Sequence, residues 1–208
     1  KTYYWRVIAH DSYDEQVAIN APFSFTTIKQ DMVIDNGAEL DKMKFAVIGD
    51  YTGTTELGSQ VASLVKNFNP DFILTLGDNV YDGKPSSMLD KMVGVLYSDY
   101  IYPYIGNHSS NSTENRFWPS IGNHDYGAVE NYTAYTEYFN LPGNERYYDF
   151  IRGEVHFFAL NSDINEPDGT NASSKQAEWL KNKLILSNST WNIVYLHHAP
   201  YSSGNTNG

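Results

Sequence analysis

Four clusters of polar residues, each placed directly after a short apolar segment, constrain this chain more than any other feature of its sequence. The clusters are Gly49-Asp50, Gly77-Asp78, Gly122-Asn123-His124-Asp125 and His197-His198. The apolar segments are typical of buried strands, and amphipathic stretches of helical period lie between them. This alternation indicates an α/β domain, in which the loops that follow the strands meet at one edge of a sheet. We therefore expect all four clusters to converge on one site.

The segment from Lys44 onward supplies the elements of this α/β domain. Its predicted strands are 45–48, 72–76, 155–160 and 193–196. A helix that ends before Pro70 is predicted from the apolar stripe Leu57, Val61, Leu64, Val65 and Phe68. Ser173 and Gln176 form a predicted capping box for a later helix. The apolar stripe of that later helix is Ala177, Leu180 and Leu184.

The N-terminal part of the chain has a different pattern. Residues 1–28 contain strand-like segments at 3–8 and 23–28, joined by a polar stretch, and so predict a β-hairpin. Because a two-stranded ribbon is marginally stable alone, we expect it to belong to a β-sandwich whose earlier strands precede this sequence. It resembles the last two strands of a fibronectin type III-like domain. Residues 29–42 are then a linker, and residues 43–208 form the α/β domain.

The composition excludes several kinds of chemistry. The formal net charge is −11 and the pI is about 4.8, so a general grip on nucleic acid is not expected. No apolar run approaches the roughly 20 residues of a membrane span. The chain has no cysteine, which excludes disulfides, thiolate metal sites and cysteine nucleophiles. Any metal chemistry must therefore use oxygen and nitrogen ligands.

Five N-glycosylation sequons favour an extracellular or secreted glycoprotein. They begin at Asn107, Asn111, Asn131, Asn171 and Asn188. The alternative is that a chain rich in asparagine and serine contains such triplets by chance. The sequence opens directly into a strand-like segment instead of a signal peptide, so we expect the natural N-terminus to lie upstream.

The side chains of the four clusters are suited to hold metal ions. Two aspartates, an asparagine, a histidine and the nearby Tyr81 offer hard oxygen donors and one imidazole, a set that suits iron, manganese or zinc. One carboxylate can bridge two cations, and cations roughly 3.5–4 Å apart stabilise both the attacking and the leaving oxygen of a phosphoryl group. The clusters therefore predict a metal site, with a carboxylate that can bridge two ions.

The order of the clusters resembles that of the calcineurin-like metallophosphoesterases, and within them the purple acid phosphatases. The blocks that carry the resemblance are Gly49-Asp50, Gly77-Asp78-Asn79-Val80-Tyr81, Gly122-Asn123-His124-Asp125 and His198-Ala199-Pro200. It covers roughly residues 44 to 205 and also includes the segment from Gln176 to Leu180. The resemblance implies an αββα sandwich with helices outside two central sheets.

The resemblance also implies a ligand for each metal. Asp50 and Tyr81 would bind Fe(III), Asn123 and His198 would bind Fe(II), Zn(II) or Mn(II), and Asp78 would bridge the two ions. The tyrosine indicates the subfamily, because the wider superfamily has a histidine two residues after the first aspartate, where this chain has threonine. The family supplies one more histidine to each metal from a Gly-His-x-His motif, which we expect beyond the end of this sequence.

The activity implied by the resemblance is that of an acid phosphatase. Hydroxide formed at the metals would attack a phosphate monoester, and His124 would stabilise charge or protonate the leaving alkoxide. Asp125 would orient the imidazole of His124. The runner-up is a related phosphodiesterase or nucleotidase with two divalent ions, in which Tyr81 is not a ligand. An inactive extracellular binding protein is a third hypothesis.

Two ambiguities concern similar motifs. The segment 106–109 repeats the Gly-Asn-His triplet, but it lacks the aspartate and lies in a stretch rich in serine and asparagine, so we predict a loop. Of the two adjacent histidines, His198 fits the spacing of the family, and strand alternation would turn His197 to the other face. His197 as the ligand stays open as the alternative.

Overall fold

The structure is a computed structural model that describes residues 43–52, 55–81, 86–126 and 132–200, together with four short strands before residue 43. Two compact units are present, Lys1–Lys42 and Met43–Gly208. In the first unit, β1 (Thr2–Trp5) pairs antiparallel with β4 (Phe23–Thr26). A second antiparallel pair, β2 (Ile8–His10) with β3 (Glu15–Val17), was not expected, because its second strand falls in the polar connector. The likeness to a fibronectin type III-like domain stays a prediction.

The second unit contains a parallel sheet of strand order β5-β6-β7. Its strands are β5 (Phe45–Ile48), β6 (Phe72–Thr75) and β7 (Phe117–Pro119). Helix α1 (Thr55–Phe68) connects the first two strands and ends before Pro70, as predicted. Short helical segments connect the last two strands: α2 (Ser86–Leu89), the π-helical η1 (Asp90–Gly94), α3 (Val95–Tyr97) and the 3-10 segment η2 (Ser98–Tyr100).

A second sheet of order β10-β9-β8 follows in the chain, and in it β10 is parallel and β8 antiparallel to the central strand β9. Its strands are β8 (Tyr148–Arg152), β9 (Val155–Ala159) and β10 (Trp191–Tyr195). The other elements are the 3-10 segment η3 (Asn123–Tyr126), α4 (Thr133–Tyr138) and α5 (Lys175–Leu186). The expected mixed α/β fold with a parallel sheet is therefore confirmed. The duplicated segment 106–109 has no helix or strand, as predicted.

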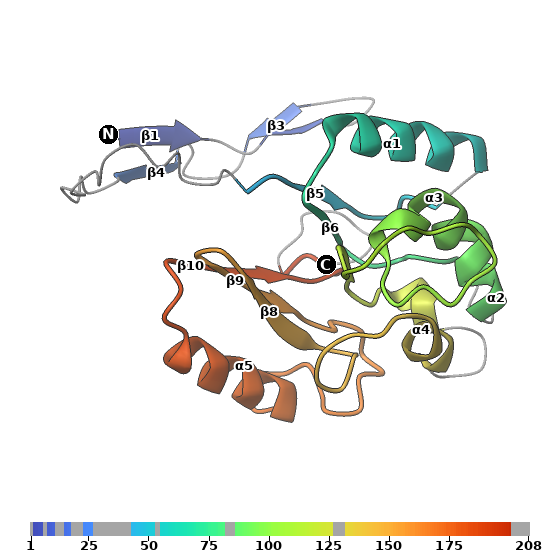
Figure 1. Cartoon of the computed structure of the whole chain (residues 1–208). Helices are drawn as coiled ribbons and strands as arrows, with labels where there is room; N and C mark the ends of the chain where they lie inside the picture. Colours follow the sequence, from blue (N-terminus) through green and yellow to red (C-terminus); the bar gives the residue numbers. More distant parts are fainter. Residues whose placement is uncertain are drawn as a thin grey trace, which may run out of the picture. The chain divides into compact units, whose positions relative to one another are not determined.

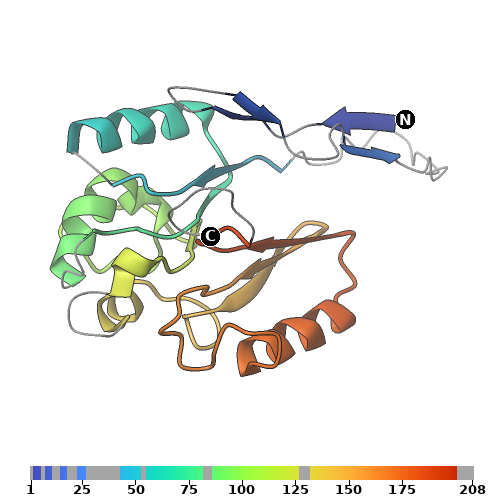
Figure 2. The same ribbon diagram turned by 180° about the vertical axis from the view of Figure 1, so that it is seen from behind.

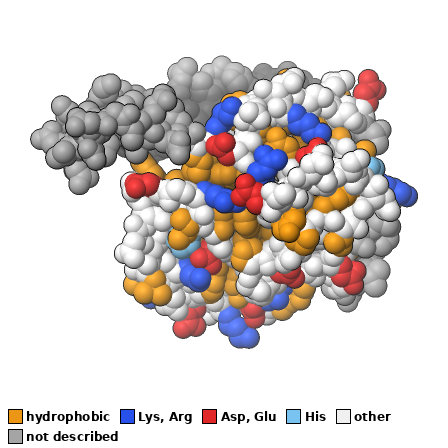
Figure 3. Space-filling view, viewed as in Figure 1, with side chains coloured by type: hydrophobic (Ala, Val, Ile, Leu, Met, Phe, Trp, Pro, Cys, Tyr) orange, Lys and Arg blue, Asp and Glu red, His pale blue; other side chains and the backbone are white. Residues whose placement is uncertain are grey.

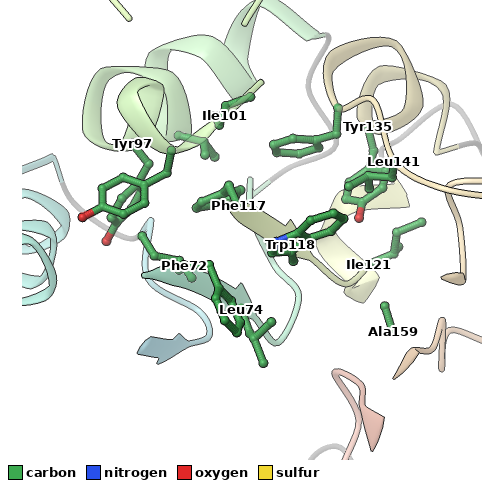
Figure 4. Close-up of a cluster of buried hydrophobic side chains, with 14 of the residues drawn as sticks. Phe72, Leu74, Tyr97, Ile101, Phe117, Trp118, Ile121, Tyr135, Leu141 and Ala159 are labelled. Carbon is green, nitrogen blue, oxygen red and sulfur yellow. The ribbon is translucent and has the colours of Figure 1, made fainter. Parts of the chain in front are cut away.

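The two sheets face each other, with α1 on the outer side of one and α5 on the outer side of the other (Figures 1 and 2). Aromatic rings fill the space between the sheets. Trp118 of β7 stacks on Phe150 of β8 at 3.9 Å, and Phe72 of β6 meets Phe157 of β9 edge to face at 5.4 Å. Figure 4 shows how the side chains of this core gather around β6 and β7. Burial of such rings is the main apolar contribution to the stability of the domain.

The buried face of α1 differs from the predicted stripe. Leu57 and Leu64 are 59% and 70% exposed, whereas Gly58, Ala62 and Val65 are buried. A Cβ added at Gly58 would lie 3.3 Å from the backbone oxygen of Tyr51. Val61 and Val65 of the predicted stripe therefore face the core together with Gly58 and Ala62, whereas Leu57, Leu64 and Phe68 are exposed.

The N-cap of α5 is one residue later than predicted. Oγ of Ser174, not of Ser173, accepts a hydrogen bond from the backbone N–H of Ala177 at 3.1 Å. Gln176 does not complete a capping box, because its side chain bonds to the backbone of Asn161. Gln176 thus connects α5 to the end of β9.

The described surface carries apolar side chains as well as charged ones. On the face seen in Figure 3, hydrophobic side chains gather in the middle, flanked by lysine, arginine, aspartate and glutamate. Among the described residues, no helix has the length and apolar character needed to cross a bilayer.

Candidate metal centre

The ends of β5, β6 and β7 are held together by backbone hydrogen bonds. Leu76 N–H donates to the carbonyl of Ile48 at 2.7 Å, and Ser120 N–H donates to the carbonyl of Thr75 at 2.9 Å. Because the strands are parallel, the loops that follow them leave the sheet at the same edge. This sheet therefore brings the first three clusters to one edge.

The turns after β5 and β6 carry an aspartate in a strained conformation. Asp50 and Asp78 both have φ of +52°, in the left-handed region that non-glycine residues rarely adopt. The preceding Gly77 has φ of +85°, and a Cβ there would lie 2.8 Å from the backbone of Gly122 and from Cβ of His197. Strain and close approach of this kind concentrate at functional sites. Here they bring three loops into contact.

Three side chains at this edge form the centre of the candidate site. Carboxylate oxygens of Asp50 and Asp78 and a ring nitrogen of His197 all lie within 4.8 Å of one another. Asp78 is buried, whereas Asp50 is exposed, so the group is open to solvent on the side of Asp50. A carboxylate pair with an imidazole at this spacing can hold a metal ion.

Hydrogen bonds of His197 fix its role. Its Nδ1 lies 2.7 Å from the carbonyl oxygen of Leu76, which can only accept, so the proton is on Nδ1. Its Nε2 faces two acceptor oxygens, Oδ1 of Asn123 at 2.9 Å and Oδ1 of Asp78 at 3.4 Å. Acceptors that face one another need a proton or a cation between them. The arrangement fits a metal ion whose imidazole ligand is oriented by a backbone carbonyl.

Tyr81 and His124 complete the rim of the site. The hydroxyl of Tyr81 donates to Oδ1 of Asp50 at 3.0 Å, and the Tyr81 ring lies 4.7 Å from the ring of His124. Burial, the hydrogen bond to Asp50 and the nearby carboxylates raise the pKa of Tyr81 above its ordinary value. The backbone N–H of His124 donates to Oδ1 of Asp78 at 3.0 Å. The ring Nε2 of His124 lies 3.9 Å from Oδ2 of the same carboxylate. The His124 side chain is 42% exposed and can reach a bound ligand.

His198 does not lie in this cluster, whereas His197, the alternative that the sequence left open, does. Nδ1 of His198 lies 2.9 Å from Oγ of Ser162, at the end of the neighbouring strand β9. The alternation argument failed because β10 ends at Tyr195, before either histidine. Tyr195 is buried, with its hydroxyl 3.3 Å from the carbonyl of Trp118. Both histidines lie beyond the end of the strand, so no strand pattern in the sequence distinguishes them.

Asp125 has hydrogen-bond partners other than the one expected. Its Oδ2 accepts from Gly122 N–H at 2.8 Å and from the side chain of Asn79 at 3.0 Å, and its Oδ1 accepts from Val80 N–H at 3.0 Å. Both oxygens are thus used to join the loops after β6 and β7, and the imidazole of His124 is not their partner. Burial raises the pKa of Asp125 to about 6, although these hydrogen bonds act in the opposite direction.

Asn79 is a positioning residue that the sequence analysis missed. It is fully buried, its Nδ2 also donates to the carbonyl of Ser120 at 2.8 Å, and its Oδ1 accepts from Thr75 at 2.5 Å and Tyr51 at 3.0 Å. Its position directly after Asp78 was visible in the sequence, but an asparagine at a strand end has many ordinary uses in turns. Its bonds hold the loop that carries Asp78.

The charge balance of the site also fits a cation. Within the described ranges, no lysine or arginine forms an ion pair with Asp50 or Asp78. A buried carboxylate without a positive partner is costly unless a proton or a metal ion compensates it. The residues present therefore suit a di- or trivalent ion held by oxygen and imidazole ligands.

Fold and site together define a metal-binding α/β domain in which loops after parallel strands supply the ligands. The chain belongs to the calcineurin-like phosphoesterase family, whose model matches residues 43–208. It is thus a metallophosphoesterase, and phosphoesters are its class of substrate. A search of curated proteins gave no match to this chain.

Proposed function

We propose that this protein is a phosphatase of the purple acid type, which hydrolyses phosphate monoesters at a dinuclear centre. In this proposal Asp50 and Tyr81 hold Fe(III), Asn123 and His197 hold Fe(II), Zn(II) or Mn(II), and Asp78 bridges them. The observation that carries it is the cluster of donor atoms of Asp50, Asp78 and His197 within 4.8 Å. The facing sheets with helices outside agree with the αββα sandwich of such enzymes.

The hydrogen bond between Tyr81 and Asp50 supports the choice of a tyrosine ligand. The two oxygens are 3.0 Å apart with a proton between them, and both belong to the open side of the cluster. A trivalent ion is best able to displace a phenolic proton whose pKa is raised, so metal binding would release this proton. The Tyr81 proton and the metal ion thus compete for the position between the Tyr81 oxygen and Oδ1 of Asp50.

The rest of the reaction is assigned to His124. When bound, a pair of such ions supplies positive charge for the phosphate group and a nucleophile from water. His124 is held beside the cluster by its backbone bond to Asp78, and its exposed ring is 3.9 Å from that carboxylate. Its imidazolium would stabilise charge on the phosphate and donate a proton to the leaving oxygen. Asp125 and Asn79 would act through the loops that they join.

Metal analysis of the intact protein tests this proposal. We expect two metal ions per chain with at least one iron, a visible tyrosinate-to-iron absorption band, and phosphomonoesterase activity that a chelator removes. Tyr81→Phe should abolish the band. Activity with two divalent ions and no such band would instead support the phosphodiesterase or nucleotidase hypothesis, and absence of metal would contradict both.

The assignment of the histidine ligand has a matched control in its neighbour. His197→Gln should lower the affinity for one of the two ions by about 10- to 100-fold, because an imidazole ligand oriented by a carbonyl is lost. His198→Gln should leave the metal content unchanged. Equal losses in both variants, or a loss confined to His198→Gln, would contradict the assignment.

The location of the protein is a separate proposal. We propose that it is extracellular, on the basis of its five sequons. A glycosidase-dependent shift in the mass of the protein from its natural source tests this.

A further inference from the structure

The two turns that carry Asp50 and Asp78 are built alike. Each turn follows the end of a strand of the parallel sheet and a glycine, and each aspartate has φ of +52°. Left-handed backbone of this kind persists in a non-glycine residue only where the surrounding structure holds it. The next residues, Tyr51 and Asn79, are both buried. Each turn therefore places a carboxylate at the candidate metal centre and the following side chain in the interior.

The two buried side chains bond to each other. Nδ2 of Asn79 donates to the carbonyl of Ser120 at 2.8 Å, and a carbonyl can only accept, so Oδ1 of Asn79 is the atom that faces Tyr51. The Tyr51 hydroxyl, 3.0 Å from this Oδ1, is therefore the donor. Thr75 donates to the same oxygen and Nδ2 donates a second bond to Asp125, so all four hydrogen-bonding positions of the amide are used. Asn79 cannot turn away from Tyr51 without leaving buried polar groups unpaired.

Three hydrogen bonds join the two turns within the described residues. The backbone N–H of Asp50 donates to the carbonyl of Gly77 at 3.4 Å, which is long for such a bond. The hydroxyl of Tyr81 donates to Oδ1 of Asp50 at 3.0 Å, and this proton is released in the proposed metal centre. The bond from Tyr51 to Asn79 is buried and also 3.0 Å long. It is therefore the shorter of the two bonds that still join the turns when metal is bound.

Tyr51 is itself held in place by packing. Its ring meets the ring of Tyr97 edge to face at 5.8 Å, and a Cβ added at Gly58 of α1 would lie 3.3 Å from its backbone oxygen. The Tyr51 hydroxyl thus has a fixed position from which to bond to Asn79. The hydroxyl of Tyr97 is also buried, but it has no hydrogen-bond partner within the described part of the chain. Two neighbouring tyrosines therefore differ in what their hydroxyls do.

We propose that Tyr51 is a positioning residue that, through Asn79, sets the spacing of Asp50 and Asp78 and so of the two ions that they hold. The inference rests on the proposed dinuclear centre and adds to it a residue outside the set of ligands. Tyr51 acts through Asn79 and is not itself a ligand. Without its hydroxyl both turns keep their carboxylates but are less firmly joined, so the ions are held less tightly and in a less productive geometry.

A pair of matched variants tests the inference in the intact protein. Tyr51→Phe and Tyr97→Phe each delete one hydroxyl oxygen from a buried ring, and the two rings are in contact. With 4-nitrophenyl phosphate, kcat of Tyr51→Phe should fall about tenfold while KM changes by less than about twofold, because the reacting groups are misplaced and no substrate contact is lost. Zn(II) titrated into the metal-free Tyr51→Phe variant should bind about tenfold more weakly than to the wild type. Tyr97→Phe should match the wild type in all three quantities.

The outcomes separate this inference from the proposed function. If the wild type binds two ions and hydrolyses the ester, but Tyr51→Phe behaves like Tyr97→Phe, the role of Tyr51 is overturned and the proposed function stands. A lower kcat of Tyr51→Phe that only reflects a smaller folded fraction, measured by circular dichroism, would also overturn it. A wild-type protein that binds fewer than two ions would overturn the proposed function, and the inference with it.

Discussion

Two buried carboxylates of this domain, Glu166 and Asp78, have opposite surroundings. Glu166 accepts from Nε of Arg146 at 3.1 and 3.2 Å and from the side chain of Asn161 at 2.6 Å. Arg146 also bonds to Asp168 at 2.7 Å, so two acids share one guanidinium. Asp78 is equally buried, but its neighbours are the backbone N–H and the ring of His124 and a ring nitrogen of His197.

The difference shows how a structural carboxylate can be told from one that awaits a ligand. Around Glu166 the chain itself supplies the positive charge, so the carboxylate in the loop after β9 needs no added cation. Around Asp78 the basic neighbours are the imidazoles of His124 and His197, no described lysine or arginine pairs with it, and the site is open at Asp50. A bound metal ion would supply the positive charge that no described lysine or arginine brings to this carboxylate.

Removal of Asp78 should have the largest effect on activity and should separate the two kinds of carboxylate most clearly. Asp78→Ala should lower kcat of the intact protein at least about a thousandfold, because the carboxylate proposed to bridge the two ions is lost. The metal-free variant should be no less stable than the metal-free wild type, since a buried carboxylate without a cation has been removed. Metal content, turnover and urea unfolding check this. Near-normal turnover, or strong destabilisation without metal, would contradict the comparison.

Removal of the internal cation should have the reverse effect. Arg146→Met leaves Glu166 buried without its partner and should lower the free energy of unfolding by about 3 kcal/mol, measured by urea unfolding without metal. Lys175→Met is the control, because Lys175 contacts the same Asp168 at 3.3 Å but is 81% exposed; a loss of less than about 1 kcal/mol is expected. Metal content should be unchanged in both variants. Equal losses of stability would show that Arg146 has no special role.

Local patterns predicted much of this fold and site from the sequence. The strand at 45–48, helix α1 and the convergence of Asp50, Asp78 and Asn123 follow from apolar periodicity and from the geometry of parallel strands. What could not be predicted depends on contacts between distant segments. The burial of Ala62 instead of Leu64 is decided by what packs against α1, and no local pattern contains that information.

The differences between the expected and the observed contacts at the site have the same origin. His197 and His198 are adjacent and chemically identical, and their separate roles depend on where β10 ends and on the position of Ser162. Asp125 lies next to His124 in the sequence, yet its oxygens bond to Asn79, Val80 and Gly122 across the site. Neighbours in sequence need not be partners when a 3-10 turn separates their side chains.

Asp125 is a third kind of buried carboxylate, with neither a cation nor an open side. It is held by neutral hydrogen-bond donors, with neither an arginine nor an open metal position, and burial raises its pKa to about 6. In the unfolded chain an aspartate titrates near about 3.9. Between these values the folded protein keeps a proton that the unfolded chain has released, so stability is highest at the acidic end and falls as pH rises.

The free energy of unfolding of the metal-free protein should therefore include a loss of about 2 kcal/mol from Asp125 between about pH 4 and 6. Asp125→Asn cannot titrate, and although it is less stable overall because its amide N–H faces other donors, it should lack this part of the pH dependence. Subtracting the two urea-unfolding curves as a function of pH isolates Asp125 from the other acids. Parallel curves would mean that Asp125 is ionised throughout this range and that its hydrogen bonds outweigh the cost of its burial.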